Sequence, residues 1–345
     1  MRRDDEPMKI GALTAPLVGA KSLADTCMYL AGLGVEAVEI GTGNYPPDGH
    51  CDPVKMLQGP EGVDAFIGAI QDSGLVLSAL SCHGNPISPN VEMAAAHDAV
   101  FRATVRLAAV IRDATGWDVV VNGFSGLPAG APGDKTPAWV TAPWPPEHLD
   151  ALKYQWDEVA IPYWTEAHKL LVEYGMDFCI EPHPNMLVFN PDTLVRLRRA
   201  CGKRICMNFD PSHFFWQSID VVAAIRWLNL VAKEDGDAGV SAIVRHMHGK
   251  DCRVYPWNLD QKGVLDTTHY SEEEERTWIF RTVGYGHGED LWRDLFSTLQ
   301  MCGYRGMVSL EHEDSLMSPQ EGFEKGIKFL QSVGISEEPG ALTWA

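Results

Sequence analysis

The sequence predicts an α/β chain in which eight parallel strands, each followed by a helix, close into a barrel. Three observations predict it: eight short apolar runs recur along the chain, segments with helical spacing separate most of them, and 345 residues suit one large barrel. An open, doubly wound sheet is the rival architecture. Its first strand would be followed by a glycine-rich turn, but Leu13-Thr14-Ala15-Pro16-Leu17 contains no such motif, which favours the barrel.

The predicted elements alternate in order along the chain. Strands are expected at residues 9–13, 37–40, 76–80, 118–121, 177–181, 205–209, 243–247 and 307–311. Helices are expected at residues 22–32, 62–73, 91–115, 147–174, 191–201, 219–232, 291–302 and 319–333. Ser22 is a candidate cap for the first of these helices, and Gly34 follows its end.

Two stretches, about residues 122–146 and 251–288, are longer than ordinary connections between a strand and a helix. Long structured insertions after barrel strands usually cover the mouth of the active site, although subunit contacts are an alternative use. No linker or low-complexity segment interrupts the pattern. We therefore expect one domain over residues 1–345, with both insertions near the mouth.

Composition narrows the classes of function. Lys and Arg number 28 against 47 Asp and Glu, a net charge of −19, which disfavours nucleic acid and anionic membrane surfaces as partners. No apolar run approaches the roughly 20 residues that span a bilayer, and the N-terminus lacks a signal-type segment. The eight cysteines form no Cys-x-x-Cys pair. These features predict a reduced, cytoplasmic protein without a cysteine-based zinc site.

Ionisable residues stand at the ends of four consecutive predicted strands, where barrel enzymes carry their catalytic groups. Glu181, Asp210, His248 and Glu311 would meet at one rim. Burying so many carboxylates without a cation is costly, and three carboxylates with one imidazole suit Mn²⁺, Mg²⁺ or Co²⁺. We predict these four as ligands of one divalent metal. His246 shares a strand face with His248, and we favour His248 because it lies nearer the rim.

Further polar residues follow the same strand ends. His183, two residues beyond Glu181, is a candidate acid or base, and a loop histidine satisfied by the backbone is the equal alternative. The remaining candidates are expected to contact substrate or to line the mouth: His213, Lys250, Asp251, Arg253, His83, Asn85 and Glu39.

Three stretches carry a resemblance to a known family: Asn208-Phe209-Asp210-Pro211-Ser212-His213, His246-Met247-His248-Gly249-Lys250-Asp251 and Val308-Ser309-Leu310-Glu311-His312-Glu313-Asp314. Over about residues 8–333 the chain resembles the xylose-isomerase-like TIM barrels known as sugar phosphate isomerases/epimerases, which include the ketose 3-epimerases. The resemblance implies that Glu181, Asp210, His248 and Glu311 hold one metal, often Mn²⁺. It also implies that His213 and Arg253 contact substrate, and that both glutamates move protons.

Two departures from the compact epimerases widen the choice of reaction. His183 after Glu181 and the insertion at 251–288 are similar to features of the catalytic subunits of C-glycoside deglycosidases, lyases that act on 3-oxo-glycosides beside a small β-rich subunit. The predicted function is thus a sugar isomerase or epimerase acting through a metal-bound enediolate. The alternative is a β-eliminating lyase in which His183 or His287 assists the leaving group.

Other readings have less support. A trinuclear metal hydrolase is disfavoured by the net charge of −19 and by a ligand set that suffices for one metal. A metal-stabilised binding protein without catalysis is the non-enzymatic alternative. The expected partners are a small sugar or glycoside, with no nucleic acid and no membrane. A homo-oligomer is expected, or a hetero-oligomer with a small β-rich subunit if the chain is a deglycosidase.

Overall fold

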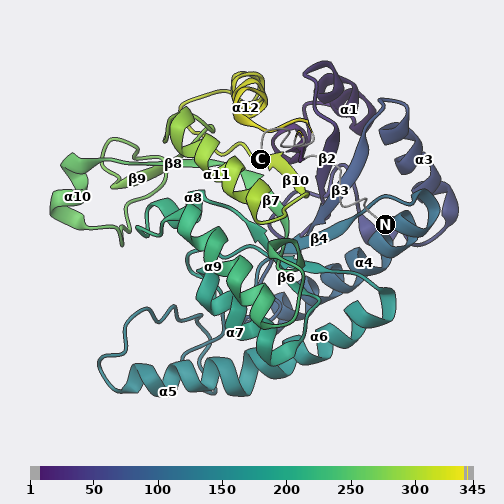
Figure 1. Ribbon diagram of the computed structural model, residues 1–345. Coiled ribbons are helices and arrows are strands. Elements are labelled where there is room, and N and C mark those ends of the chain that lie inside the picture. Colours follow the sequence, from purple (N-terminus) through teal and green to yellow (C-terminus); the bar gives the residue numbers. More distant parts are fainter. Residues whose placement is uncertain (1–7, 338–339, 341–345) are drawn as a thin grey trace.

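The centre of the molecule is a closed barrel of eight parallel strands, seen in a computed structural model that describes residues 8–337 and 340 (Figure 1). The barrel strands are β1 (Lys9–Leu13), β2 (Ala37–Gly41), β3 (Val76–Ser81), β4 (Val120–Gly123), β5 (Phe178–Ile180), β6 (Ile205–Phe209), β7 (Val244–Gly249) and β10 (Met307–Leu310). They are ordered β1-β10-β7-β6-β5-β4-β3-β2 around the barrel. The predicted fold class is confirmed.

Two strand boundaries differ from the prediction in a way that matters for the site. Strand β4 starts at Val120 and continues to Gly123, because Asn122 pairs in register with Ser81 on β3 and Cys179 on β5. Strand β7 likewise continues to Gly249. Polar residues of these strands face the inside of the barrel, so an apolar run underestimates the strands' length. His248 therefore belongs to the strand itself.

Helices surround the barrel (Figure 1). They are α1 (Leu23–Gly32), α2 (Pro53–Met56), α3 (Pro60–Gln71), α4 (Val91–Thr115), α5 (Glu147–Lys153), α6 (Ile161–Tyr174), α7 (Pro191–Cys201), α8 (Ser212–Phe215), α9 (Val221–Glu234), α10 (Pro256–Lys262), α11 (Glu289–Met301) and α12 (Pro319–Val333). Ser22 caps α1 as predicted, because its side chain accepts a hydrogen bond from the Asp25 amide at 3.1 Å.

The helix predicted over residues 147–174 has a π-helical segment, Tyr154–Ala160, between α5 and α6. Gln155 of this segment is buried, and its amide nitrogen donates to the carbonyl oxygens of Ala129 and Ala138 at 3.1 and 2.6 Å. These bonds attach the insertion at 122–146 to the helix layer. A local change of helical pitch leaves no mark on a hydrophobic pattern.

The insertion at 251–288 contains its own small sheet, which projects from the barrel together with α10 (Figure 1). Strands β8 (Asp251–Val254) and β9 (Trp278–Arg281) pair antiparallel. Trp278 stacks on Trp216, just after α8, with ring centroids 4.9 Å apart and an interplanar angle of 7°. The hairpin is therefore packed against the segment that follows β6. Over the described residues, no helix combines the length and hydropathy that crossing a membrane requires.

Candidate active site

Four potential metal ligands converge at the carboxyl end of the barrel. Glu181 follows β5, Asp210 follows β6, His248 lies near the end of β7 and Glu311 follows β10. These strands are neighbours around the barrel, so their ends meet at one rim. One potential ligand atom from each residue lies within 4.8 Å of the others, which makes the group able to bind a metal ion.

Glu181 is the most heavily hydrogen-bonded member of the group. Its Oε2 accepts from Nε2 of His83 at 3.0 Å, and its Oε1 lies 2.8 Å from Nε2 of His213. The amide of Asn208 donates to it at 3.1 Å. Burial alone would raise the pKa of this carboxyl, but His248, His213 and His83 hold the pKa well below its usual value. Glu181 is therefore an anion at neutral pH.

Asp210 carries the clearest sign of an additional cation. The turn after β6 fixes its Oδ1, which accepts from the Ser212 amide at 2.8 Å. Its Oδ2 is buried, with Nε2 of His213 3.1 Å away and Nζ of Lys250 3.5 Å away. Because Nε2 of His213 lies nearer to Glu181, at 2.8 Å, Oδ2 of Asp210 has no donor of its own, which is unfavourable for a buried carboxylate unless a cation approaches it. The donor set of three carboxylates and one imidazole thus fits a divalent metal.

Lys250 lies beside the group and already supplies one positive charge. Its Nζ is 3.1 Å from Oε2 of Glu311 and 2.5 Å from Oε2 of Glu313. Burial would lower the pKa of this ammonium, but the surrounding carboxylates raise it well above its usual value. Lys250 likewise helps to lower the pKa of Glu311 to about 2, against the effect of burial. The sequence predicts Lys250 as a substrate contact, and the structure shows it in contact with Glu311 and Glu313.

His183 lies beside the group, with its ring centroid 4.2 Å from that of His213. Its Nδ1 is 2.6 Å from the carbonyl oxygen of Pro184. Because a carbonyl can only accept, Nδ1 donates and Nε2 carries a lone pair. Desolvation is the main cause that lowers the pKa of this imidazole to about 3, so it is neutral at physiological pH. His183 thus combines the two alternatives drawn from the sequence. The backbone binds Nδ1, as in a loop histidine, and Nε2 remains available as an acid or base.

Other residues near these strand ends lie outside the group. Arg253 is exposed on β8 and donates to the Gly286 carbonyl at 2.9 Å. Asp251 is buried, and its Oδ2 accepts from the amides of Gly286 and His287 at 3.1 and 2.9 Å. A Cβ at Gly286 would lie 2.3 Å from Asp251, so only glycine permits this approach. Nδ1 of His287 is 2.7 Å from the same carboxylate. Asp251 therefore organises the insertion.

Comparison with known proteins places the chain in a family. A family profile described as xylose isomerase-like TIM barrel matches residues 28–333. The chain belongs to the xylose isomerase-like TIM barrel family. The uncharacterized protein YfiH of Bacillus subtilis (strain 168) is 36% identical over 327 residues, which cover 94% of this chain and 98% of that protein.

Solved structures share the fold of this xylose isomerase-like barrel at low sequence identity. The probable 3-DHS dehydratase AsbF from Bacillus anthracis superposes with a TM-score of 0.61 at 14% identity, covering 94% of this chain and 99% of that one. D-Psicose 3-epimerase from Clostridium cellulolyticum H10 gives a TM-score of 0.59 at 15% identity, covering 96% and 100%. Similarity at this level concerns the fold alone.

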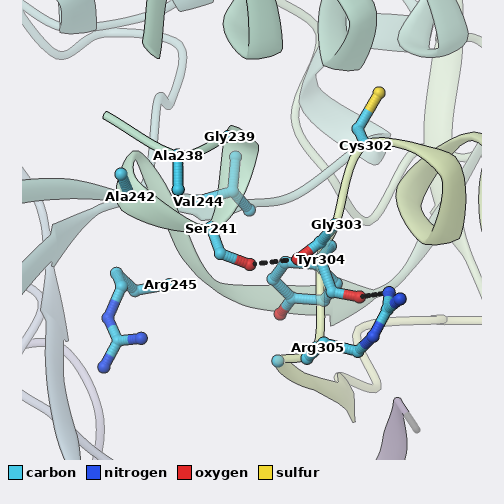
Figure 2. Close-up of a pocket in the computed structure, with 11 residues that line it drawn as sticks. Ala238, Gly239, Ser241, Ala242, Val244, Arg245, Cys302, Gly303, Tyr304 and Arg305 are labelled. Carbon is cyan, nitrogen blue, oxygen red and sulfur yellow. Dashed lines mark hydrogen bonds between the residues drawn. The ribbon is translucent and has the colours of Figure 1, made fainter. Parts of the chain in front are cut away.

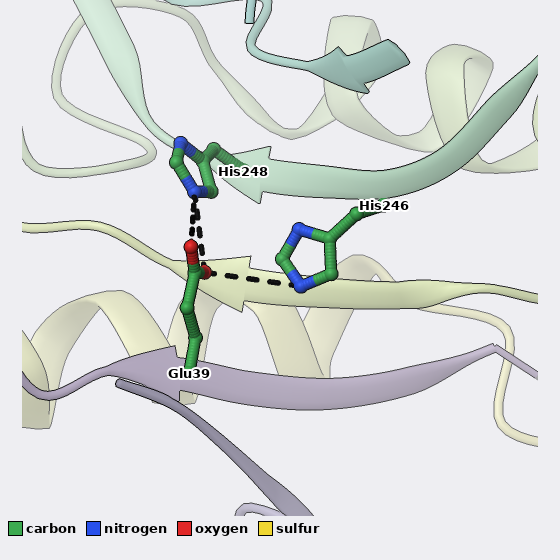
Figure 3. Close-up of side chains that lie close together, drawn as sticks. All are labelled: Glu39, His246 and His248. Carbon is green, nitrogen blue, oxygen red and sulfur yellow. Dashed lines mark hydrogen bonds and ion pairs between the residues drawn. The ribbon is translucent and has the colours of Figure 1, made fainter. Parts of the chain in front are cut away.

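Beneath the rim, Glu39 of β2 contacts the far side of the His248 ring (Figure 3). Both of its carboxylate oxygens lie 3.2 Å from Nε2 of His248, while Nδ1 of the same ring is 2.9 Å from Oε2 of Glu311. Burial would lower the pKa of this imidazole, but Glu311, Glu39 and Glu181 raise it well above its usual value, so both ring nitrogens donate to carboxylates. If a cation took the place of the proton on Nδ1, Glu39 would hold the remaining proton on Nε2 and leave a lone pair on Nδ1 toward the four-residue group. Glu39 is fully buried, so it lies below the site and does not line its mouth as expected from the sequence.

His246 lies deeper than the four-residue group. Its Nε2 is 3.8 Å from Glu39 (Figure 3). Its Nδ1 is 3.0 Å from Oδ1 of Asn208. Asn208 therefore touches both His246 and Glu181. Sequence reasoning passed over Asn208, although its position two residues before Asp210 on β6 would place it on the same strand face.

Replacing Glu39 with glutamine is expected to weaken Mn²⁺ binding by roughly 10- to 100-fold, because an amide no longer enforces the His248 tautomer. Isothermal titration calorimetry of the metal-free protein measures the effect. Glu36→Gln, which removes the same charge at an exposed position just before β2, serves as the control. Equal Mn²⁺ affinity in the two variants would show that Glu39 does not orient the histidine.

A cavity of about 330 Å³ lies at the opposite end of the barrel, where residues preceding β10 and around the start of β7 line it (Figure 2). Its polar side chains bind the protein itself: Ser241 donates to the Gly303 carbonyl at 2.9 Å, and Arg245 pairs with Asp118 at 2.9 Å. The three clusters of potential metal ligands among the described residues include none of its lining residues. The potential metal ligands of the described residues thus lie away from this cavity.

Proposed function

We propose that this protein is a divalent-metal-dependent sugar isomerase or epimerase that removes a proton from the carbon beside a carbonyl group. The observation that carries the proposal is the approach of Glu181, Asp210, His248 and Glu311 within 4.8 Å at four adjacent strand ends. These residues would hold one metal ion, with Mn²⁺ preferred because it accepts mixed oxygen and nitrogen ligands, and with Mg²⁺ or Co²⁺ as alternatives.

The chain's own residues account for the proton transfers. A cation bound at the site would polarise the carbonyl and stabilise the enediolate charge. Glu181 and Glu311 approach Nδ1 of His248 at 3.2 and 2.9 Å, so two carboxylates are available, one to remove a proton and the other to return it. Lys250 beside Glu311 can donate to a substrate oxygen. Return of the proton to the opposite face gives an epimer, and return to the neighbouring carbon gives an isomer.

A β-eliminating lyase acting on 3-oxo-glycosides is the second candidate, and His183 is the observation that favours it. Its Nε2 is an available base, because Nδ1 is bound to the Pro184 carbonyl. A neutral imidazole can remove the proton beside the carbonyl and then protonate the departing group at the β carbon. Both reactions would form the same enediolate. They differ in the next step, which is return of a proton in the isomerase or epimerase and loss of the group at the β carbon in the lyase.

Incubation of the full chain with Mn²⁺ in D₂O distinguishes the candidates. A panel of ketoses and a 3-oxo-glucoside are followed by NMR. Deuterium entering the carbon beside the carbonyl, with the sugar skeleton intact, is expected for an isomerase or epimerase. Release of the aglycone from the oxo-glucoside, suppressed in His183→Gln, would establish the lyase. If no compound exchanges and EDTA changes only the melting temperature, both catalytic assignments fail and a metal-stabilised binding protein replaces them.

A further inference from the structure

The four-residue group is almost closed to solvent, and its remaining exposure is on one side. The side chains of Asp210 and His248 are 0% exposed and that of Glu181 is 3%, whereas that of Glu311 is 12% exposed. Glu311 is in turn bound to Lys250, which contacts the rim residue Glu313. A substrate whose oxygens reach the group must therefore accommodate the rest of its structure near Glu311 and Lys250.

A cavity of about 230 Å³ adjoins these residues and is lined by Tyr270, Ile279, Phe280, Glu313 and Ser315. Two contacts connect it with the site. The ammonium of Lys250 lies 4.2 Å from the centre of the Phe280 ring, and Glu313 is the carboxylate that Lys250 contacts at 2.5 Å. The cavity is therefore connected with the four-residue group through Lys250, which contacts Glu311 on one side and two lining residues on the other.

The aromatic wall of this cavity belongs to the insertion at 251–288 and is held in place by packing. The Tyr270 and Phe280 rings are nearly parallel, with an interplanar angle of 13° and 6.1 Å between their centroids. On the other side, Arg276 lies 4.1 Å from the Tyr270 ring centre and 4.8 Å from that of Trp278. Trp278 is itself stacked on Trp216. The wall is thus formed before any ligand arrives, which lowers the entropic cost of binding.

The chemistry of the lining selects the kind of group that can occupy it. A chain of hydroxyl groups loses hydration when it is buried and needs a hydrogen-bond partner for each group. Among the lining residues only Glu313 and Ser315 have polar side chains other than the Tyr270 hydroxyl, and Glu313 already binds Lys250. A flat apolar ring has no hydrogen bonds with water to lose when it is buried, and it packs favourably against aromatic side chains.

We propose that this cavity is a subsite for an aromatic ring of the substrate, beside the end that binds at the four-residue group. The inference rests on the proposed function, because it assumes that vicinal substrate oxygens bind at the four-residue group. It narrows the substrate to an α-hydroxycarbonyl compound, or an oxidised sugar, that carries an aryl substituent.

Hydroxamates test the subsite, because they share one chelating group and differ only in the substituent. Calorimetry on the Mn²⁺-loaded full chain compares acetohydroxamate, benzohydroxamate and gluconohydroxamate. Benzohydroxamate is expected to bind roughly 10- to 100-fold more tightly than acetohydroxamate, and the polyhydroxylated probe no more tightly than acetohydroxamate. Tyr270→Ala, at a residue that is 51% exposed, should remove most of the preference, and Tyr270→Phe should retain it.

Trp257→Ala is the matched control, because Trp257 is an exposed aromatic residue of the same insertion that does not line the cavity. Equal affinity for benzohydroxamate and acetohydroxamate, both dependent on Mn²⁺, would overturn the subsite and leave the proposed function intact. A preference that survives in Tyr270→Ala, or that Trp257→Ala removes equally, would also overturn it. Absence of any Mn²⁺-dependent binding would overturn the proposed function and the subsite together.

Discussion

Replacing Glu181 with glutamine is expected to abolish stoichiometric binding of Mn²⁺ and to lower proton exchange at the carbon beside the carbonyl by about 1,000-fold. The reason is that Glu181 occupies the centre of the site. It offers one of the four clustered ligand atoms and accepts from both His83 and His213. An amide at this position removes the negative charge and turns one acceptor into a donor that faces other donors.

The measurement combines metal analysis of the purified variant with deuterium exchange followed by NMR. Glu166→Gln, at a residue on the outer surface of α6 whose side chain is 65% exposed, removes the same charge without touching the site. Circular dichroism verifies that both variants are folded. A Glu181→Gln protein that still binds one Mn²⁺ per chain with unchanged affinity would exclude Glu181 as a ligand.

Replacing Lys250 with methionine is expected to have opposite effects on stability and on metal affinity. In the metal-free protein the change leaves Glu311, Glu313 and Asp210 without their shared ammonium, and the free energy of unfolding should fall by about 3–5 kcal/mol. The same change removes a positive charge from the immediate neighbourhood of two proposed ligands. Mn²⁺ should therefore bind at least about 10-fold more tightly than in the unaltered chain.

Urea unfolding in EDTA measures the first effect, and calorimetric titration with Mn²⁺ measures the second. Lys169→Met provides the comparison, because Lys169 forms an ion pair on the surface with a side chain that is 68% exposed. Such a pair contributes at most about 1 kcal/mol. Weaker Mn²⁺ binding in Lys250→Met would contradict the idea that the ammonium and the metal compete for the same carboxylates.

The sequence was sufficient to predict the barrel and the rim residues because both follow from order along the chain. Eight apolar runs close into one sheet, and parallel strands bring their carboxyl ends to one edge. Glu181, Asp210, His248 and Glu311 could therefore be grouped without knowledge of distances between strands.

Interactions across the barrel were not predictable in the same way. Glu39 reaches His248 from β2, a strand far from β7 in the sequence, and nothing in the local pattern around Glu39 distinguishes a residue below the site from one at its mouth. The register between the strands decides whether Glu39 lies below the site or at its mouth, and this register cannot be derived from a single sequence. The approach of Tyr270 to Phe280 was likewise not predictable, because it depends on the hairpin formed by β8 and β9.

The position of Lys250 also bears on the order in which the protein is assembled. Small zinc domains need their ion to fold, because nothing else holds their ligands together. Here the Lys250 ammonium already compensates Glu311, while Nε2 of His213 donates a hydrogen bond to Glu181. Such a chain could complete its barrel first and bind the proposed cation afterwards. The identity of that ion would then be decided by the supply surrounding the finished protein, and it could be exchanged without unfolding.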